Sequence, residues 1–298
     1  MEKLYPVQIK RFFGSIVTIG YCGLRFWVEP STPYFDYAFT FIFMFLLGIP
    51  HGAGDHLLIQ KQKKDQGLSF SLISFVGSYL GVMLLYAVMW YYLPKISFVI
   101  FILISIFHFG DFENDEIEKG IYAYFQKMSL GLGILGWIIY FHYDEVKVVL
   151  GDWVWALPVA LPDYYPYLFL LGILLGFRRK SIYRYFNTLL TLLLSCFLPL
   201  LPAFVCYFAC CHAVYSLSDM SEHLQLTIKS LLAKLLPFSF LAFLMGYFFL
   251  KMNSNSYVIY YFFIFLSLLT MPHFWLMHQN VKKIMPKHVI FILFHYLF

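Results

Sequence analysis

Four histidines lie inside strongly apolar stretches of the sequence, where an ionisable side chain is costly and calls for a specific role. They are His51, His108, His212 and His273. Imidazole is a good ligand for iron, zinc, copper and nickel, and histidines from different helices of a bundle often build a metal site in its core. The simpler alternative is that each ring only forms a hydrogen bond with a neighbouring helix. The choice depends on whether the four rings share one depth in a membrane.

Two carboxylates accompany the first two histidines at helical spacing. Asp55 follows His51 by four residues and Asp111 follows His108 by three, so each pair lies on one face of a helix. We expect each carboxylate to accept the far ring N–H of its histidine and so to fix the orientation of a metal ligand. For Asp111 the alternative is a residue that merely ends an apolar segment and opens the acidic loop 111–116.

The elements that must position these residues are transmembrane helices. Of the 298 residues, 61% are hydrophobic and 12% are charged, and the mean hydropathy of +0.73 excludes an ordinary soluble domain. A span needs about 20 apolar residues, which leaves room for roughly eight to ten spans. We predict an all-α polytopic transmembrane helix bundle, with a single integral membrane domain over residues 1–298. The predicted spans cover about 12–29, 36–59, 69–93, 96–113, 120–141, 153–177, 184–202, 203–220, 235–252 and 257–279.

The distribution of positive charge predicts the orientation. With a cytoplasmic N-terminus, sixteen of the 21 Lys and Arg residues fall on the cytoplasmic side of this topology, whereas Lys95, Lys147 and Lys251 fall opposite. We therefore predict a multi-pass protein of the cell (plasma) membrane with its N-terminus in the cytoplasm. The net charge of +5 is expected to face membrane lipid headgroups, and no nucleic-acid partner is expected.

The same topology puts the four histidines at one level. Their spans are the second, fourth, eighth and tenth, which run in the same direction, and each histidine falls in the cytoplasmic half. At a rise of about 1.5 Å per residue, His51, His212 and His273 lie on the order of 10 to 14 Å from the cytoplasmic ends of their spans. His108 lies closer to its span end. This agreement in depth favours a shared metal site over four separate hydrogen bonds.

The sequence around these histidines resembles the successive motifs of the Brp/Blh-type β-carotene 15,15′-dioxygenases. The matching stretches are Pro50–His56 (PHGAGDH), His108 with Asp111, Tyr207-Phe followed by His212, and Leu269–His273 (LTMPH). The resemblance implies a polytopic helical fold, a non-haem Fe(2+) held by histidines, O2 as co-substrate, and cleavage of β-carotene or a related carotenoid to retinal.

The third motif departs from the family pattern. The family usually shows a His-x-x-x-His pair there, and the position of its second histidine is Ser216 in this chain. Three alternatives for the metal shell are open: His273 completes it, His223 completes it, or three histidines bind together with water. A catalytically impaired relative is a further alternative.

These observations together predict a membrane non-haem iron dioxygenase. The predicted metal ligands are the four histidines, Asp55 and Asp111 orient two of them, and no separate catalytic acid or base is expected. The leading alternative is a membrane transporter or a proton or cation relay that uses the same histidines and aspartates. The outer halves of the second, fourth and tenth spans are nearly free of ionisable groups, which argues against a relay. The sequence indicates no particular oligomeric state.

Overall fold

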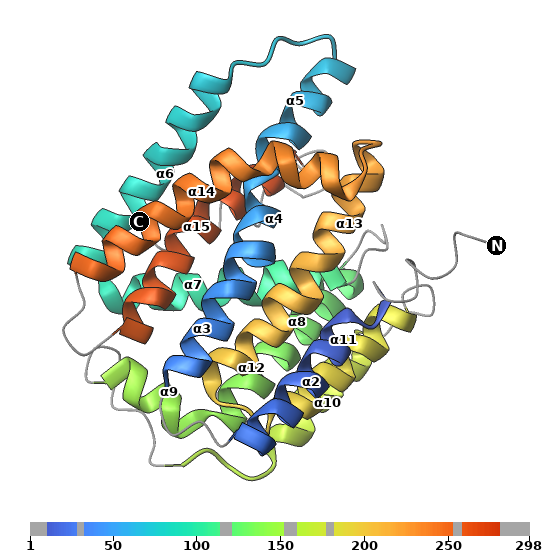
Figure 1. Cartoon of the computed structure of the whole chain (residues 1–298), viewed down its shortest axis with the longest axis vertical. Helices are drawn as coiled ribbons and strands as arrows, with labels where there is room; N and C mark the ends of the chain where they lie inside the picture. Colours follow the sequence, from blue (N-terminus) through green and yellow to red (C-terminus); the bar gives the residue numbers. More distant parts are fainter. Residues whose placement is uncertain are drawn as a thin grey trace.

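The structure is a computed structural model that describes residues 11–28, 33–113, 121–151, 160–176, 182–252 and 258–280. All regular structure in these residues is helical, as the all-α prediction expects (Figure 1). The helices are α2 (Phe13–Val28), α3 (Tyr34–Phe43), η1 (Met44–Gly48), α4 (Ile49–Ala53), α5 (Asp55–Asp65), α6 (Leu72–Tyr92), α7 (Pro94–Glu113), α8 (Ile121–Phe141), α9 (Tyr143–Leu150), α10 (Tyr165–Leu175), α11 (Ile182–Ser195), α12 (Leu200–Tyr207), η4 (Phe208–Ala213), α13 (Val214–His223), α14 (Ile228–Met252) and α15 (Val258–Asn280). The two η segments are π-helical.

Six helical segments of the described residues are long and apolar enough to cross a membrane. They are Tyr34–Asp65, Leu72–Tyr92, Pro94–Asp111, Leu200–His223, Ile228–Met252 and Val258–Leu276. Each coincides with one of the predicted spans, and all four histidines of interest lie on them. The chain is therefore a helical membrane protein.

The other four predicted spans coincide with helices that fall short of this length or hydropathy. Helices α2, α11 and α10 have 16, 14 and 11 residues, and α8 has 21 residues but is less apolar. The predicted span 153–177 lies outside the described residues as far as position 159. The predicted boundary at Pro202 is wrong, because α12 already begins at Leu200 and a proline in a first helical turn breaks no hydrogen bond. The count of eight to ten spans and the orientation of the N-terminus stay predictions.

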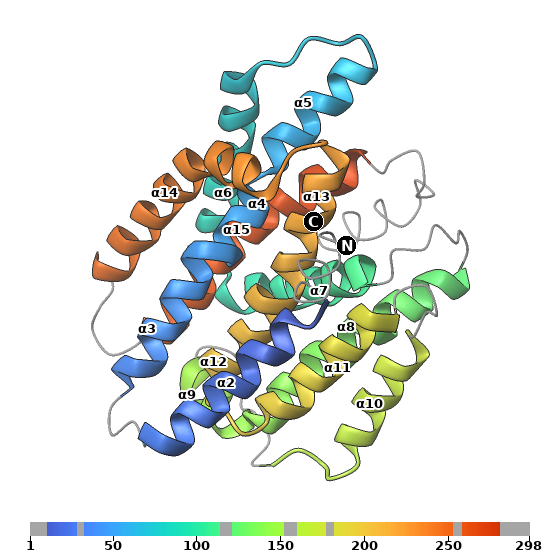
Figure 2. The same cartoon turned by 45° about the vertical axis from the view of Figure 1, so that its right-hand side comes forward.

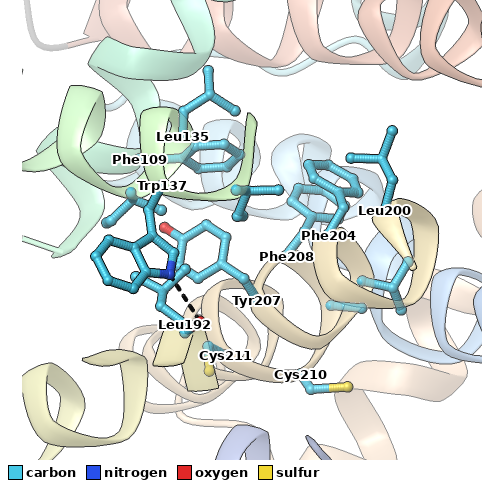
Figure 3. Packing of buried hydrophobic residues seen from close by; sticks show 14 of the residues in the cluster. Phe109, Leu135, Trp137, Leu192, Leu200, Phe204, Tyr207, Phe208, Cys210 and Cys211 are labelled. Carbon is cyan, nitrogen blue, oxygen red and sulfur yellow. Dashed lines mark hydrogen bonds between the residues drawn. The ribbon is translucent and has the colours of Figure 1, made fainter. Parts of the chain in front are cut away.

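The segment Leu200–His223 runs through the middle of the bundle (Figures 1 and 2). Its most apolar window is 89% buried, against 6% for Leu72–Tyr92 at the periphery. Side chains from α7, α8 and α11 pack around it, among them Phe109, Trp137 and Leu192 (Figure 3). The indole N–H of Trp137 also donates a hydrogen bond to the Leu192 carbonyl. The protein core is thus built around the helix that carries His212.

Helices α7 and α8 cross at a pair of glycines. A Cβ atom at Gly131 would lie 1.7 Å from the carbonyl oxygen of Ile106, and one at Gly110 would lie 1.8 Å from that of Lys127. Neither position can hold a side chain, because the neighbouring atoms belong to the opposite backbone. Small residues allow this close approach of membrane helices. The crossing fixes the end of α7 that carries His108.

Candidate metal centre

The structure brings the four histidines together from four parts of the chain: His51 from α4, His108 from α7, His212 from η4 and His273 from α15. One ring nitrogen of each of His51, His108 and His273 lies within 4.8 Å of the other two. His212 joins them through its Nε2, which is 3.1 Å from Nε2 of His108. We call these four residues the histidine cluster. Its members are buried except for His108, which is half-buried.

Irregular backbone precedes or contains three of the four histidines. His51 lies three residues after the π-helical segment η1, and His212 lies inside the π-helical segment η4. His273 follows Pro272, which lacks the N–H that a regular helix would use. A π-turn changes the direction in which the following side chains point, and such turns occur frequently at functional sites. The irregular segments thus lie where the rings converge.

The hydrogen bonds of two rings assign their tautomers. Nδ1 of His51 donates to the carbonyl oxygen of Gly48, and Nδ1 of His273 donates to the Asp55 carboxylate at 2.8 and 2.9 Å. A carbonyl oxygen and a carboxylate can only accept a hydrogen bond. Each Nδ1 is therefore assigned the proton, and each Nε2 presents a lone pair. A deprotonated Nε2 is the form of imidazole that binds a metal ion.

The close contact between His108 and His212 also bears on metal binding. Two imidazole nitrogens at 3.1 Å repel each other if both present lone pairs, so a proton or a cation must lie between or beside them. One protonated Nε2 that donates to the other satisfies the contact without charge, and a metal ion satisfies it by binding both lone pairs; His212 is fully buried, so such an ion would need several ligands around it. The donor set of the cluster therefore fits a transition-metal ion.

Asp55 supports a different histidine from the one expected. The spacing predicts a bond to His51, but the carboxylate accepts from His273. The reason is local: Nδ1 of His51 already donates to the Gly48 carbonyl in the preceding turn, and Gly54 interrupts the regular α-helical hydrogen bonding between His51 and Asp55. The carboxylate is 1% exposed, and the ring that it contacts is a member of the cluster other than the one predicted.

Asp111 differs from the prediction more strongly. Its carboxylate forms an ion pair with Lys127 of α8 at the rim of the bundle. The glycine crossing of α7 and α8 explains this, because it brings the backbone of Lys127 against Gly110 and its ammonium group to Asp111. Asp111 is thus the residue that ends an apolar segment, which the sequence left as the alternative.

The structure also shows the location of Ser216, at which the family usually has a histidine. Ser216 lies on α13, four residues beyond His212, and His273 supplies the fourth ring from α15. His223 is the last residue of α13, about 16 Å further along the helix axis than His212. Its backbone carbonyl accepts a hydrogen bond from Lys61. Of the proposed alternatives, the geometry favours His273.

Three aromatic residues of the site were not predicted. Phe208 stacks on the His212 ring at 5.8 Å between centroids, and Phe109 meets the same ring edge-on at 5.2 Å. Tyr79 of α6 donates to the Leu269 carbonyl, one turn before His273. Phe208 precedes His212 by four residues, a helical spacing that could have indicated it. No local pattern marks Tyr79.

A cavity of about 230 Å³ adjoins the cluster and is lined by His51, His108 and His273. Aliphatic and aromatic side chains form nearly all the rest of its wall, and they come from both halves of the chain. An apolar cavity with a few convergent polar groups is the usual form of a small-molecule site. The arrangement can therefore hold an apolar molecule next to a bound metal ion.

Known proteins are similar to this chain over most of its length. The family model of β-carotene 15,15′-dioxygenase matches residues 42–279, which contain the whole histidine cluster. The chain is 28% identical over 253 residues to a β-carotene 15,15′-dioxygenase of uncultured marine bacterium 66A03, covering 76% of this chain and 87% of that protein. No solved structure matches the chain. The chain belongs to the β-carotene 15,15′-dioxygenase family.

Proposed function

We propose that this protein is a membrane non-haem iron dioxygenase that cleaves the central double bond of β-carotene, or of a related carotenoid, to give retinal. The observation that carries the proposal is the meeting of four imidazoles, three of them buried and one half-buried, beside an apolar cavity in a chain of this family. The proposed location is the plasma membrane, in which a carotenoid dissolves.

The residues that would hold Fe(2+) are His51, His108, His212 and His273. This assignment is supported by the two Nε2 lone pairs that their hydrogen bonds leave available and by the 3.1 Å approach of His108 to His212. A shell of histidines without a carboxylate suits a ferrous ion that keeps positions open for other ligands. When bound, this iron supplies the redox chemistry by which O2 reacts with a carbon–carbon double bond.

The overall reaction balances with O2 as the only oxidant. One double bond breaks and each of its carbons takes one oxygen atom, so that a symmetric carotenoid gives two aldehydes. No proton is gained or lost overall, so the balanced reaction requires no acid or base. The role of the chain is to bind and orient the polyene, to exclude water, and to hold the rings in place.

Positioning of the ligands extends to Asp55. Its carboxylate accepts a hydrogen bond from Nδ1–H of His273. This bond fixes the orientation of the ring and makes the lone pair of Nε2 a stronger electron-pair donor to a metal ion. The apolar wall of the cavity provides contacts to a hydrocarbon chain along most of its length. The bond to be cut must therefore lie where this wall gives way to the histidines.

The direct test is expression of the full chain in cells that accumulate β-carotene, with pigment extraction and measurement of iron in the purified protein. The expected result is loss of β-carotene, appearance of retinal, and iron that copurifies with the protein. His51→Ala is the matched negative variant. Cells that keep their carotenoid and contain neither retinal nor a longer aldehyde would refute the enzymatic proposal, whereas iron bound without cleavage would identify an impaired relative.

A further inference from the structure

Among the residues that the structure describes, no exposed side chain lines one end of the cavity beside the histidine cluster. Along α7 its lining runs from His108 through Ser105 and Phe101 to Phe98, a length of about 15 Å at the helical rise. At the far end it is bounded by Trp90, Val149, Leu150, Leu200 and Tyr260. Each of these five side chains is buried or half-buried. We call this part of the cavity the closed arm.

Helix α9 forms the end wall of the closed arm. Val146, Val149 and Leu150 project from it into the cavity lining. A carboxylate oxygen of Glu145 on the same helix accepts a hydrogen bond of 3.0 Å from the backbone N–H of Leu200, the first residue of α12. This bond ties the end wall to the central helix that carries His212, so the distance between the wall and the cluster is fixed.

The cavity reaches the protein surface at a different place. Among its described lining residues, the ones with exposed side chains are Leu80 of α6, which is 44% exposed, and Leu241 of α14, which is 55% exposed. Both helices belong to the apolar membrane-crossing set, and both pack against α15 (Figures 1 and 2). We call the gap between them the lateral opening. Because both helices are apolar enough to cross a membrane, we expect this opening to face lipid.

The lateral opening lies close to the depth of the cluster. Tyr79, the neighbour of Leu80, donates a hydrogen bond to the Leu269 carbonyl, and Leu269 precedes His273 by one helical turn, about 6 Å. On the side of α5 the gap is bounded by His56. The centroid of its ring lies 4.4 Å from the ring centroid of Phe238 on α14. A hydrocarbon that passes between α6 and α14 therefore meets the histidines first and the closed arm beyond them.

The volume of the cavity limits what it can hold. Pockets for drug-sized ligands usually measure about 300–1,000 Å³, and this one has about 230 Å³. A whole carotenoid, with two ring-bearing halves, is larger than such a ligand. Only part of it can lie inside the cavity, and the rest must extend through the lateral opening into the bilayer.

From this geometry we infer that a lipid-dissolved carotenoid enters between α6 and α14 one end first. Its leading half occupies the closed arm up to α9, and its trailing half stays in the lateral opening. The closed arm acts as a stop that sets which double bond lies at the cluster, so Val149 and Leu150 are specificity-determining residues. The inference rests on the proposed function for its substrate, but uptake of the polyene can be measured without cleavage.

The lateral opening is tested by the rate at which the purified full chain takes up β-carotene from carotenoid-loaded lipid vesicles in the absence of oxygen. Leu80→Trp and Leu241→Trp are each expected to slow uptake roughly tenfold, because an indole fills the gap. Leu84→Trp and Leu236→Trp are the controls, since both residues are exposed on the same two helices, at 67% and 57%, outside the cavity lining. The controls are expected to match the unmodified chain within about twofold.

The closed arm is tested by the products formed in air. Val149→Phe shortens the arm and is expected to replace retinal by a pair of aldehydes of unequal length. Val149→Ala lengthens the arm without overfilling the core, and is expected to give a mixture of central and off-centre cleavage. Val148→Phe is the control, because Val148 is the next residue of α9, is 76% exposed and does not line the cavity.

The outcomes separate this inference from the proposed function. Equal uptake by the two blocked variants and their controls would overturn the lateral opening, even if the chain makes retinal. Retinal as the sole product of both Val149 variants, at the unmodified rate, would overturn the role of α9 as a stop. Uptake that is slowed only in the blocked variants would support the opening, even if no cleavage is detected in air.

Discussion

The sharpest prediction concerns the carboxylate behind His273. Asp55→Asn replaces a buried, negatively charged acceptor by a neutral one of almost the same shape. The amide oxygen can still accept the Nδ1 proton, but it no longer increases the electron density at Nε2. We therefore expect the ring to stay in place while its affinity for a metal ion falls.

The magnitude follows from the two contacts of 2.8 and 2.9 Å and from the burial of the pair. Loss of a partner behind a ligating histidine typically lowers metal affinity by about 10- to 100-fold, or about 1.4 to 2.8 kcal/mol. Asp55→Asn keeps one neutral hydrogen bond and should fall near the lower end of this range. Asp55→Ala removes the acceptor altogether and should fall near the upper end.

The assay is competition for Fe(2+) between the purified protein and a chelator of known affinity under anaerobic conditions. Asp111→Asn is the matched control. The Asp111 carboxylate pairs with Lys127 at the rim of the bundle, and the Asp111 side chain is 38% exposed. Such an exposed pair contributes little, so the control should retain iron like the unmodified chain. Equal iron affinity for Asp55→Asn, Asp111→Asn and the unmodified chain would refute the role assigned to Asp55.

Three further predictions use the same protein. His51→Ala and His108→Ala should each abolish stoichiometric iron measured by elemental analysis; iron retained in both would show that the ligands are misassigned. Ser216→His, which restores the residue usual in the family, should leave iron occupancy unchanged or raise it, and a clear loss would contradict the geometry. Gly131→Ala should lower the unfolding temperature and the bound iron together, because a Cβ there meets backbone and overpacking costs about 1–3 kcal/mol. Gly77→Ala is its control, with open space around the added methyl group, and equal losses in the two variants would argue against the α7–α8 crossing as the cause.

The histidine cluster is accessible from the sequence because polar residues are conspicuous in apolar runs. The parity of the spans and the helical rise then suffice to estimate that His51, His212 and His273 share one depth. The six strongest apolar segments could be predicted because each is long and hydrophobic enough to cross a membrane. Span boundaries depend on proline, as at Pro202, which ends a hydrophobic helix in one context and begins it in another.

The partners of the two aspartates could not be predicted by spacing alone. Helical spacing says which side chains share a face but not which acceptor a ring chooses, and His51 donates to the Gly48 carbonyl instead of to Asp55. Asp111 lies on an unbroken helix, but its partner is decided by how closely α8 approaches α7, which depends on where glycines of two separate helices meet. The π-helical segments have no clear sequence signal, although they determine where His212 points.

The wall of the cavity also bears on the transport alternative. A proton or cation relay needs hydrogen-bonding groups at short intervals from the cluster to both faces of the membrane. On α7 the described residues that line the closed arm beyond Ser105 are Ile102, Phe101 and Phe98. Their side chains have no group that could transfer a proton or bind an ion. The exposed side chains at the lateral opening are Leu80 and Leu241, which are apolar too. A passage whose walls are mostly aliphatic and aromatic on both sides of a polar centre suits a hydrocarbon that must be brought to a metal, and it offers a moving charge few groups to bind.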